Sequence, residues 1–74
     1  MEITVKLFAT LRKERFKSTV YTYENAPMIS DIVDRLSIAE EDLAIILVNG
    51  KNADLDTVLA DGDTLALFPP VGGG

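Results

Sequence analysis

Hydrophobic and polar side chains alternate over residues 2–8, which is the two-residue period of a strand buried on one side only. Phe8, at the end of this alternation, falls on the nominally solvent-facing side. Residues 18–24 are rich in Thr, Val and Tyr and favour a second strand, antiparallel to the first. The apolar positions that define the buried face of the first strand are Ile3, Val5 and Leu7.

Two further strands are predicted in the second half of the chain. Residues 43–48 form a continuous apolar run, which predicts the central strand of the sheet, and residues 64–68 form the last strand. Asn49-Gly50 and Asp61-Gly62-Asp63 are predicted as turns. The connection between these turns is expected to supply three core side chains, Leu55, Val58 and Leu59.

One short amphipathic helix is predicted after the second strand. Ser30 is the expected N-cap, and Asp31 falls in the first turn, where the helix dipole favours negative charge. Residues 9–17 predict a turn with one helical turn, and residues 37–42 predict an acidic loop. The apolar residues that repeat at helical spacing, and that should cover one face of the sheet, are Ile29, Ile32, Val33 and Leu36.

The predicted order of two strands, one helix and two strands indicates an α+β fold of the ubiquitin-like β-grasp type. In this fold a mixed sheet of about four to five strands packs on one main helix. So short a chain buries both apolar faces only if the helix covers one side of the sheet. The β-grasp domain is expected to span residues 1–68, and residues 69–74 are expected to form a flexible tail of two prolines and three glycines around Val71.

The composition excludes several classes of function. The 74 residues include neither cysteine nor histidine, which removes disulfides, thiolate nucleophiles, imidazole ligands and the usual general base near neutral pH. No metal site is therefore expected. A net charge of −5 disfavours nucleic acid as a partner and favours a basic protein. With neither a membrane-length apolar run nor a basic leader, we predict a cytoplasmic protein with no membrane contact.

Two groups of charged residues are interpreted first as solvated surface. The acidic residues between Glu40 and Asp63 lack the spaced loop and closing glutamate of a calcium site. The only basic cluster in the sequence could contact phosphate or an acidic partner, although cations on an exposed loop are commonly just solvated. Its members are Arg12, Lys13, Arg15 and Lys17.

The last seven residues, from Phe68 to Gly74, combine a rigid stalk with a glycine end. Proline fixes φ near about −65°, so Pro69 and Pro70 should carry the tail away from the folded body. Glycine has no Cβ atom and presents the smallest cross-section, so the end could thread a narrow channel in another protein. The α-carboxylate of Gly74 is therefore the best candidate for the working group of this protein, in preference to an inert, floppy end.

Three stretches of the chain resemble the ThiS/MoaD-like sulfur carriers, and within that family they are most similar to small subunits of molybdopterin synthase. These stretches are Leu7-Phe8-Ala9-Thr10-Leu11-Arg12, Val48-Asn49-Gly50-Lys51, and the segment from Asp61 to Val71 that runs into the glycine end. The last segment is specific, because it joins a strand, a double proline and a terminal Gly-Gly at a fixed distance. The resemblance covers the whole chain and implies the same β-grasp fold.

The resemblance implies a carrier that has no catalytic residues of its own. In this family an E1-like adenylyltransferase of the MoeB kind uses ATP to adenylate the C-terminal carboxylate. A sulfur donor protein then converts the transient acyl adenylate to a thiocarboxylate. The large synthase subunit, of the MoaE kind, receives the tail, and the sulfur enters the dithiolene of molybdopterin. No cofactor is stably bound to the carrier itself.

The resemblance also implies roles for individual residues of the tail. Gly74 matches the modified glycine, and Gly73 matches its neighbour. Gly72 departs from the Ala, Ser or Thr that is usual there, which loosens the tail. The segment that would lie in the partner's groove consists of Pro69, Pro70, Val71 and Gly72.

On the folded body, the resemblance assigns Phe8 and Phe68 to an apolar contact surface for the large synthase subunit and the activating enzyme. Arg12 matches a common basic residue of the family at this interface. Asn52-Ala53 departs from the larger apolar or aromatic residue that is frequent there, which predicts a smaller contact patch. From the residues alone, both phenylalanines could equally belong to the core or to an exposed aromatic patch.

Three alternative functions stay open. The chain could carry sulfur for thiamine thiazole, a tungsten cofactor or another sulfur-containing metabolite, although Phe-Pro-Pro-Val favours the molybdopterin side. It could be a ubiquitin-like modifier in which activated Gly74 acylates a lysine amine. It could also be a plain interaction domain with an inert tail.

Overall fold

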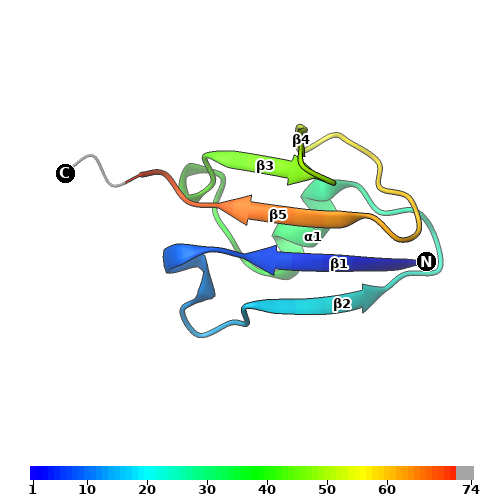
Figure 1. Cartoon of the computed structure of the whole chain (residues 1–74), viewed down its shortest axis with the longest axis horizontal. Coiled ribbons are helices and arrows are strands. Elements are labelled where there is room, and N and C mark those ends of the chain that lie inside the picture. Colours follow the sequence, from blue (N-terminus) through cyan, green and yellow to red (C-terminus); the bar gives the residue numbers. More distant parts are fainter. Residues whose placement is uncertain (72–74) are drawn as a thin grey trace.

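The computed structural model describes residues 1–71, which form one five-stranded sheet packed on one α-helix (Figure 1). Two short 3-10 helices, η1 and η2, lie in the connections. In chain order the elements are β1 (Glu2–Leu7), η1 (Ala9–Arg12), β2 (Ser18–Thr22), α1 (Ile29–Arg35), η2 (Glu40–Asp42), β3 (Ile45–Val48), β4 (Lys51–Asn52) and β5 (Thr64–Phe68).

The strand order in the sheet is β2-β1-β5-β3-β4. β1 and β5 pair in parallel, and the other neighbours pair antiparallel. The predicted β-grasp arrangement, a mixed sheet wrapped around one helix, is confirmed. The prediction that residues 43–48 form the central strand is wrong, because β5 occupies the centre. β3 lies next to the two-residue strand β4, near the edge of the sheet, and is only partly covered.

The hydrophobic core lies between α1 and one face of the sheet. In Figure 1 the helix lies behind β1 and β5. All the apolar positions predicted for the buried faces of the first strand and the helix are buried, and Leu65 and Leu67 of β5 are fully buried with them. The twelve-membered core is completed from outside these elements by Leu11, Ile38 and Leu59.

The helix begins in a different way from the prediction, which placed the N-cap at Ser30. The N-cap is Met28, whose backbone N–H donates to the Asp31 carboxylate at 2.9 Å. The backbone N–H groups of Ile29 and Ser30 donate to the carbonyls of Thr57 and Leu55. Carbonyls of a distant loop therefore satisfy the first helical donors, which sequence capping rules assign to a local side chain.

The predicted turns hold the start of β5 in place. Asn49 and Gly50 have φ values of 52° and 83°, as the β3–β4 hairpin requires, and Gly62 has a φ of 87°. The Asn49 side chain accepts a hydrogen bond from the Thr64 backbone N–H and donates one to the Asp63 carboxylate, both at 2.9 Å. Asp63 in turn accepts from the Ala60 N–H at 2.8 Å. This network fixes where β5 begins.

The connection between β4 and β5 only partly matches its prediction. Leu59 is buried and Leu55 is partly buried, as expected. Val58 is 61% exposed, so its assignment to the core is wrong. The backbone at Val58 forms an isolated antiparallel bridge with Met28, and neighbouring residues of an extended segment point to opposite sides. Burial of Leu59 therefore turns Val58 outward.

We expect Leu67→Ala to lower the free energy of unfolding by about 2 to 5 kcal/mol, because it removes a fully buried side chain from the central strand and leaves a cavity. Ile45→Ala, on the neighbouring strand at a position that is 45% exposed, should lower it by about 1 kcal/mol. Urea denaturation of both variants measures the difference. Equal losses would contradict the assignment of the two positions to opposite faces.

Candidate functional site

The sheet face away from α1 is not covered by any element of residues 1–71, and we call it the outer face. Its composition follows from the register, because residues directly opposite each other on paired strands point to the same side. Ile45 lies opposite Phe68, and Leu47 lies opposite Ala66. These four residues from two adjacent strands therefore form an apolar strip that leads to the end of β5.

Phe8 and Phe68 come together at that end of the outer face. Their rings stack with centroids 4.2 Å apart and an interplanar angle of 8°. Leu7 pairs with Leu67, and the residue that follows in each strand projects to the opposite side, which places the two rings next to each other. Both phenylalanines are half-buried and lie outside the core. The question left open by the sequence is thus resolved in favour of a surface aromatic pair.

Arg12 joins this aromatic pair from η1. Its Nε–H donates to the Leu7 carbonyl at 2.7 Å, and its guanidinium lies over the Phe8 ring, 5.3 Å from the ring centroid. The chain reverses at Ala9, whose φ is 52°, and this turn brings the end of η1 back beside the end of β1. A cation is thereby held against the aromatic pair.

The described part of the tail starts from the same place. β5 ends at Phe68, and Pro69, Pro70 and Val71 continue without sheet pairing. Val71 is 91% exposed. An open groove of about 390 Å³ runs along this segment, and it is lined by Phe8, Ala9, Thr10, Ile45, Phe68, Pro69, Pro70 and Val71. The groove is therefore continuous with the aromatic pair, and it is almost entirely apolar.

The structure brings together six of the residues singled out from the sequence, namely Phe8, Arg12, Phe68, Pro69, Pro70 and Val71. Gly72, Gly73 and Gly74 lie outside the described residues, so their roles stay predictions, as does the boundary between domain and tail at Phe68.

Sequence reasoning missed Ile45 and Leu47 as surface residues. The continuous apolar run over residues 43–48 concealed the alternation, in which Ile46 and Val48 pack against the core and their neighbours face outward. The signal that could have found them is register, because any residue opposite an outward Phe68 must also point outward. Asn52 lies opposite Leu47 on this face, whereas Ala53 packs against the core.

Two other kinds of feature are not found among the described residues. Within residues 1–71, no three acidic side chains gather closely enough to hold a metal ion. No helix in the same range is long and apolar enough to cross a bilayer. The feature that distinguishes this molecule is therefore an apolar outer face beside the base of the tail.

Comparison with known protein families agrees with this geometry. The model of the ThiS family matches residues 5–74. The chain belongs to the ThiS family. This family of ThiS- and MoaD-like proteins comprises sulfur carriers and ubiquitin-like proteins. A search of curated proteins found no significant match to the chain.

Solved structures similar to this ThiS-family chain come from several branches. SAMP1 from Haloferax volcanii is 28% identical, with a TM-score of 0.79 and full coverage of both chains. A second structure from this organism, described as small archaeal modifier protein 1, is 26% identical with a TM-score of 0.76. A chain in the complex of subunits 1 and 2 of the molybdopterin-converting factor from Helicobacter pylori is 25% identical, with a TM-score of 0.68 and full coverage of both chains.

A third similar structure supports the fold alone. The protein described as putative molybdopterin converting factor subunit 1 from Pyrococcus furiosus is 24% identical, with a TM-score of 0.77, and the match covers 96% of this chain and 99% of that one. Together with the two structures above, it confirms the β-grasp fold of the chain.

We expect the two stacked rings to stabilise each other. In a double-mutant cycle of Phe8→Ala and Phe68→Ala, the coupling in the free energy of unfolding should be about 0.5 to 1.5 kcal/mol, the range for aromatic pairs. Each single change should cost less than the roughly 3 to 5 kcal/mol of a core phenylalanine, because both rings are only half-buried. Thermal or urea denaturation of the four proteins gives the cycle, and a coupling of zero would contradict the stack.

Proposed function

We propose that this ThiS-family chain is the sulfur-carrying small subunit of a molybdopterin synthase. The observation that carries the proposal is the combination of the tail with the outer face. The Phe8–Phe68 pair and the groove along Pro69, Pro70 and Val71 form one continuous apolar surface at the point where the tail leaves the fold. A partner that docked on this surface would receive the tail in a fixed direction.

One comparison and one feature of the structure support a large synthase subunit as that partner. The similar chain from Helicobacter pylori was solved in a complex of subunits 1 and 2 of the molybdopterin-converting factor, and this chain matches it over its full length. The apolar strip of Ile45, Leu47 and Ala66 extends the contact surface beyond the aromatic pair, in keeping with the apolar cores of stable interfaces.

The chemistry proposed for the tail takes place on Gly74. Its carboxylate attacks the α-phosphorus of ATP on an E1-like adenylyltransferase, pyrophosphate leaves, and an acyl adenylate forms. Sulfide-level sulfur delivered by a sulfur donor protein then displaces AMP and leaves a thiocarboxylate. This sulfur passes to a pterin precursor in the large subunit, and water restores the Gly74 carboxylate. The carrier holds no resident cofactor and acts in the cytoplasm, where ATP is available. With no cysteine or histidine in the chain, catalysis belongs to the partner enzymes.

A second candidate function is that of a protein modifier. It is favoured by the similarity to a Haloferax volcanii structure described as small archaeal modifier protein 1, which matches 95% of this chain and 98% of that one. In this case the same acyl adenylate would be attacked by a lysine amine of a target protein, and an isopeptide bond would form in place of the thiocarboxylate. The two functions share activation and differ only in the nucleophile.

Deletion of Gly74 should abolish activation while leaving the fold intact. Incubation of the intact chain with ATP and its activating enzyme should release pyrophosphate. With a sulfur donor present, the intact mass should rise by the exchange of one oxygen for sulfur. The deletion variant should give neither signal. Its free energy of unfolding should change by less than about 0.5 kcal/mol, because the core lies entirely between Ile3 and Leu67.

A matched control keeps every native residue and adds one alanine after Gly74, which moves the carboxylate away from the glycine. This variant should also lose activation. Activation of either altered chain would contradict the role of Gly74. Isopeptide-linked proteins on denaturing gels, in the absence of thiocarboxylate, would favour the modifier function.

Phe68→Ala should weaken binding to the large synthase subunit by about 2 kcal/mol or more, as expected for an aromatic anchor at the centre of an interface. Val58→Ala is the matched control, because Val58 is 61% exposed in the connection between β4 and β5, where its backbone pairs with Met28 at the start of α1. Calorimetric titration measures both affinities. Equal effects of the two substitutions would place the interface elsewhere.

A further inference from the structure

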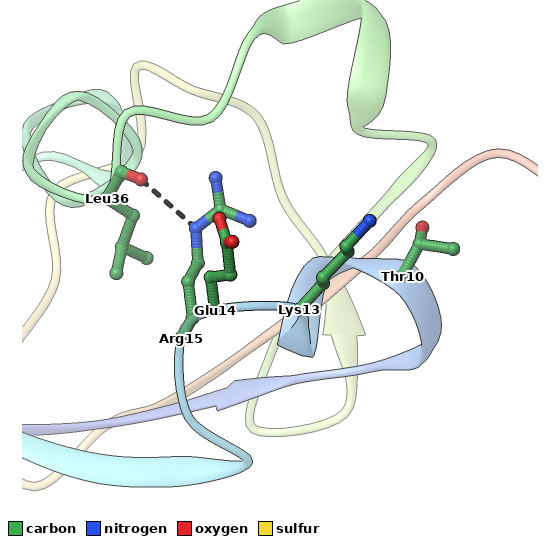
Figure 2. Close-up of a pocket in the computed structure, with 5 residues that line it drawn as sticks. All are labelled: Thr10, Lys13, Glu14, Arg15 and Leu36. Atoms are coloured by element: carbon green, nitrogen blue, oxygen red, sulfur yellow. Dashed lines mark hydrogen bonds between the residues drawn. The ribbon is translucent and has the colours of Figure 1, made fainter.

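The basic cluster of the sequence is divided in space. Figure 2 shows Arg15 beside Leu36, at the C-terminal end of α1, and Lys13 farther from Leu36, on the side of Thr10. Arg15 donates from Nε to the Leu36 carbonyl at 3.2 Å, and its other nitrogens donate to the carbonyls of Leu11 and Ser37. A guanidinium at this position satisfies carbonyls at a helix end and complements the helix dipole. Arg15 therefore has a structural role within the fold.

The other two cations of the cluster, Arg12 and Lys17, face a different concavity and are joined there by Lys6 from β1. This concavity, of about 350 Å³, is lined by Lys6, Phe8, Arg12, Lys17 and Ser18. We call it the cationic notch. Three of the seven basic residues of the chain thus gather at one place, although Lys6 lies well outside the basic run of the sequence.

The notch has no acidic residue in its lining. The cross-strand neighbours of Lys6 are Ser18 on β2 and Ala66 on β5, and both are uncharged. All three cations are exposed. Like charges that gather in this way repel each other. The chain has twelve acidic residues and a net charge of −5, yet none of these carboxylates lines the notch to offset the repulsion. An arrangement of this kind is complementary to an anionic group from outside the molecule.

Phe8 connects the notch to the candidate docking surface. It lines the notch on one side and the apolar groove along Pro69, Pro70 and Val71 on the other. Lys6 lies opposite Ala66 of the apolar strip. A protein seated on the outer face would therefore reach the notch with an adjacent part of its own surface.

We propose that the cationic notch binds an acidic segment of the protein that docks on the outer face. The inference rests on the proposed function only in so far as a protein partner occupies that face, and it does not depend on the sulfur pathway. It also reverses the local expectation from net charge: the partner must present carboxylates opposite Lys6, Arg12 and Lys17.

The first test uses a capped hexaglutamate peptide and requires no natural partner. In an NMR titration at low ionic strength, the backbone amides of Lys6, Phe8, Arg12, Lys17 and Ser18 should shift together in a saturable manner. The shifts should disappear at high salt, because exposed charges are screened. Shifts spread over all basic residues, or none that saturate, would overturn the proposal. So would tighter binding of inorganic phosphate or ATP than of the peptide, because that result would identify a small-anion site.

Two double variants separate the notch from general electrostatics. Lys6→Gln with Lys17→Gln removes two notch charges, while Lys13→Gln with Lys51→Gln removes two charges elsewhere on the surface. Peptide affinity should fall at least about fivefold in the first variant and less than about twofold in the second. Equal losses would overturn the proposal. Thermal melting of both variants checks that the fold is retained, and Arg12 is left unchanged because its Nε–H binds the Leu7 carbonyl.

The second test uses the large synthase subunit and compares association rates. The notch variant should associate more slowly than the control variant and show a weaker dependence on salt, as expected when a charge near an interface is removed. If the intact chain does not bind this subunit although the peptide result holds, the proposed function fails and the notch stands. If the intact chain binds and both variants behave alike in both tests, the notch fails and the proposed function stands.

Discussion

The parallel pairing of β1 with β5 is the constraint on which the rest of the molecule depends. It places Leu65 and Leu67 in the core beside Val5 and Leu7, and all four side chains are fully buried. Because side chains alternate along a strand, the same register sends Phe8 and Phe68 to the outer face. A shift by one residue would exchange the two sets. Stability and the candidate docking surface are thus two consequences of one register.

A sheet covered on a single side suits the proposed role of a carrier whose chemistry takes place on partner enzymes. The chain is too short to bury a large pocket, and it has no cysteine or histidine with which to build a nucleophilic site. It can nevertheless leave one sheet face free, because the core is completed on the other face by α1 together with Leu11, Ile38 and Leu59. The hydrogen bonds of Asn49 and Asp63 fix the start of β5. The strand then runs rigidly to Phe68, so the base of the tail has a defined position relative to the outer face.

Local patterns predicted most of this architecture, and tertiary contacts account for the errors. The two-residue period located β1, and the closing strand was predicted with its observed bounds, Thr64–Phe68. Ser30 was wrongly expected to cap the helix, because the carbonyls of Leu55 and Thr57 approach from far along the chain. The run over residues 43–48 could not reveal its outward members until its partner strand was known. The sequence left Phe8 and Phe68 open between the core and an exposed aromatic patch. The face of the sheet on which each ring lies becomes known only from the strand register.

The partner proposed for the cationic notch differs from the basic partner that net charge alone favours. Exposed charges separated by more than a Debye length, about 8 to 10 Å at physiological ionic strength, hardly influence each other. Even the two shorter dimensions of the molecule, 23 and 20 Å, exceed this length. Charges on the far side of the molecule are therefore screened from a protein on the outer face, whereas Lys6, Arg12 and Lys17 border the surface on which we propose that it docks. The net charge of the whole chain governs its solubility and its long-range electrostatics. The charge of the surface beside the tail depends on the fold, because β1 adds Lys6 to residues of the basic cluster that is contiguous in the sequence.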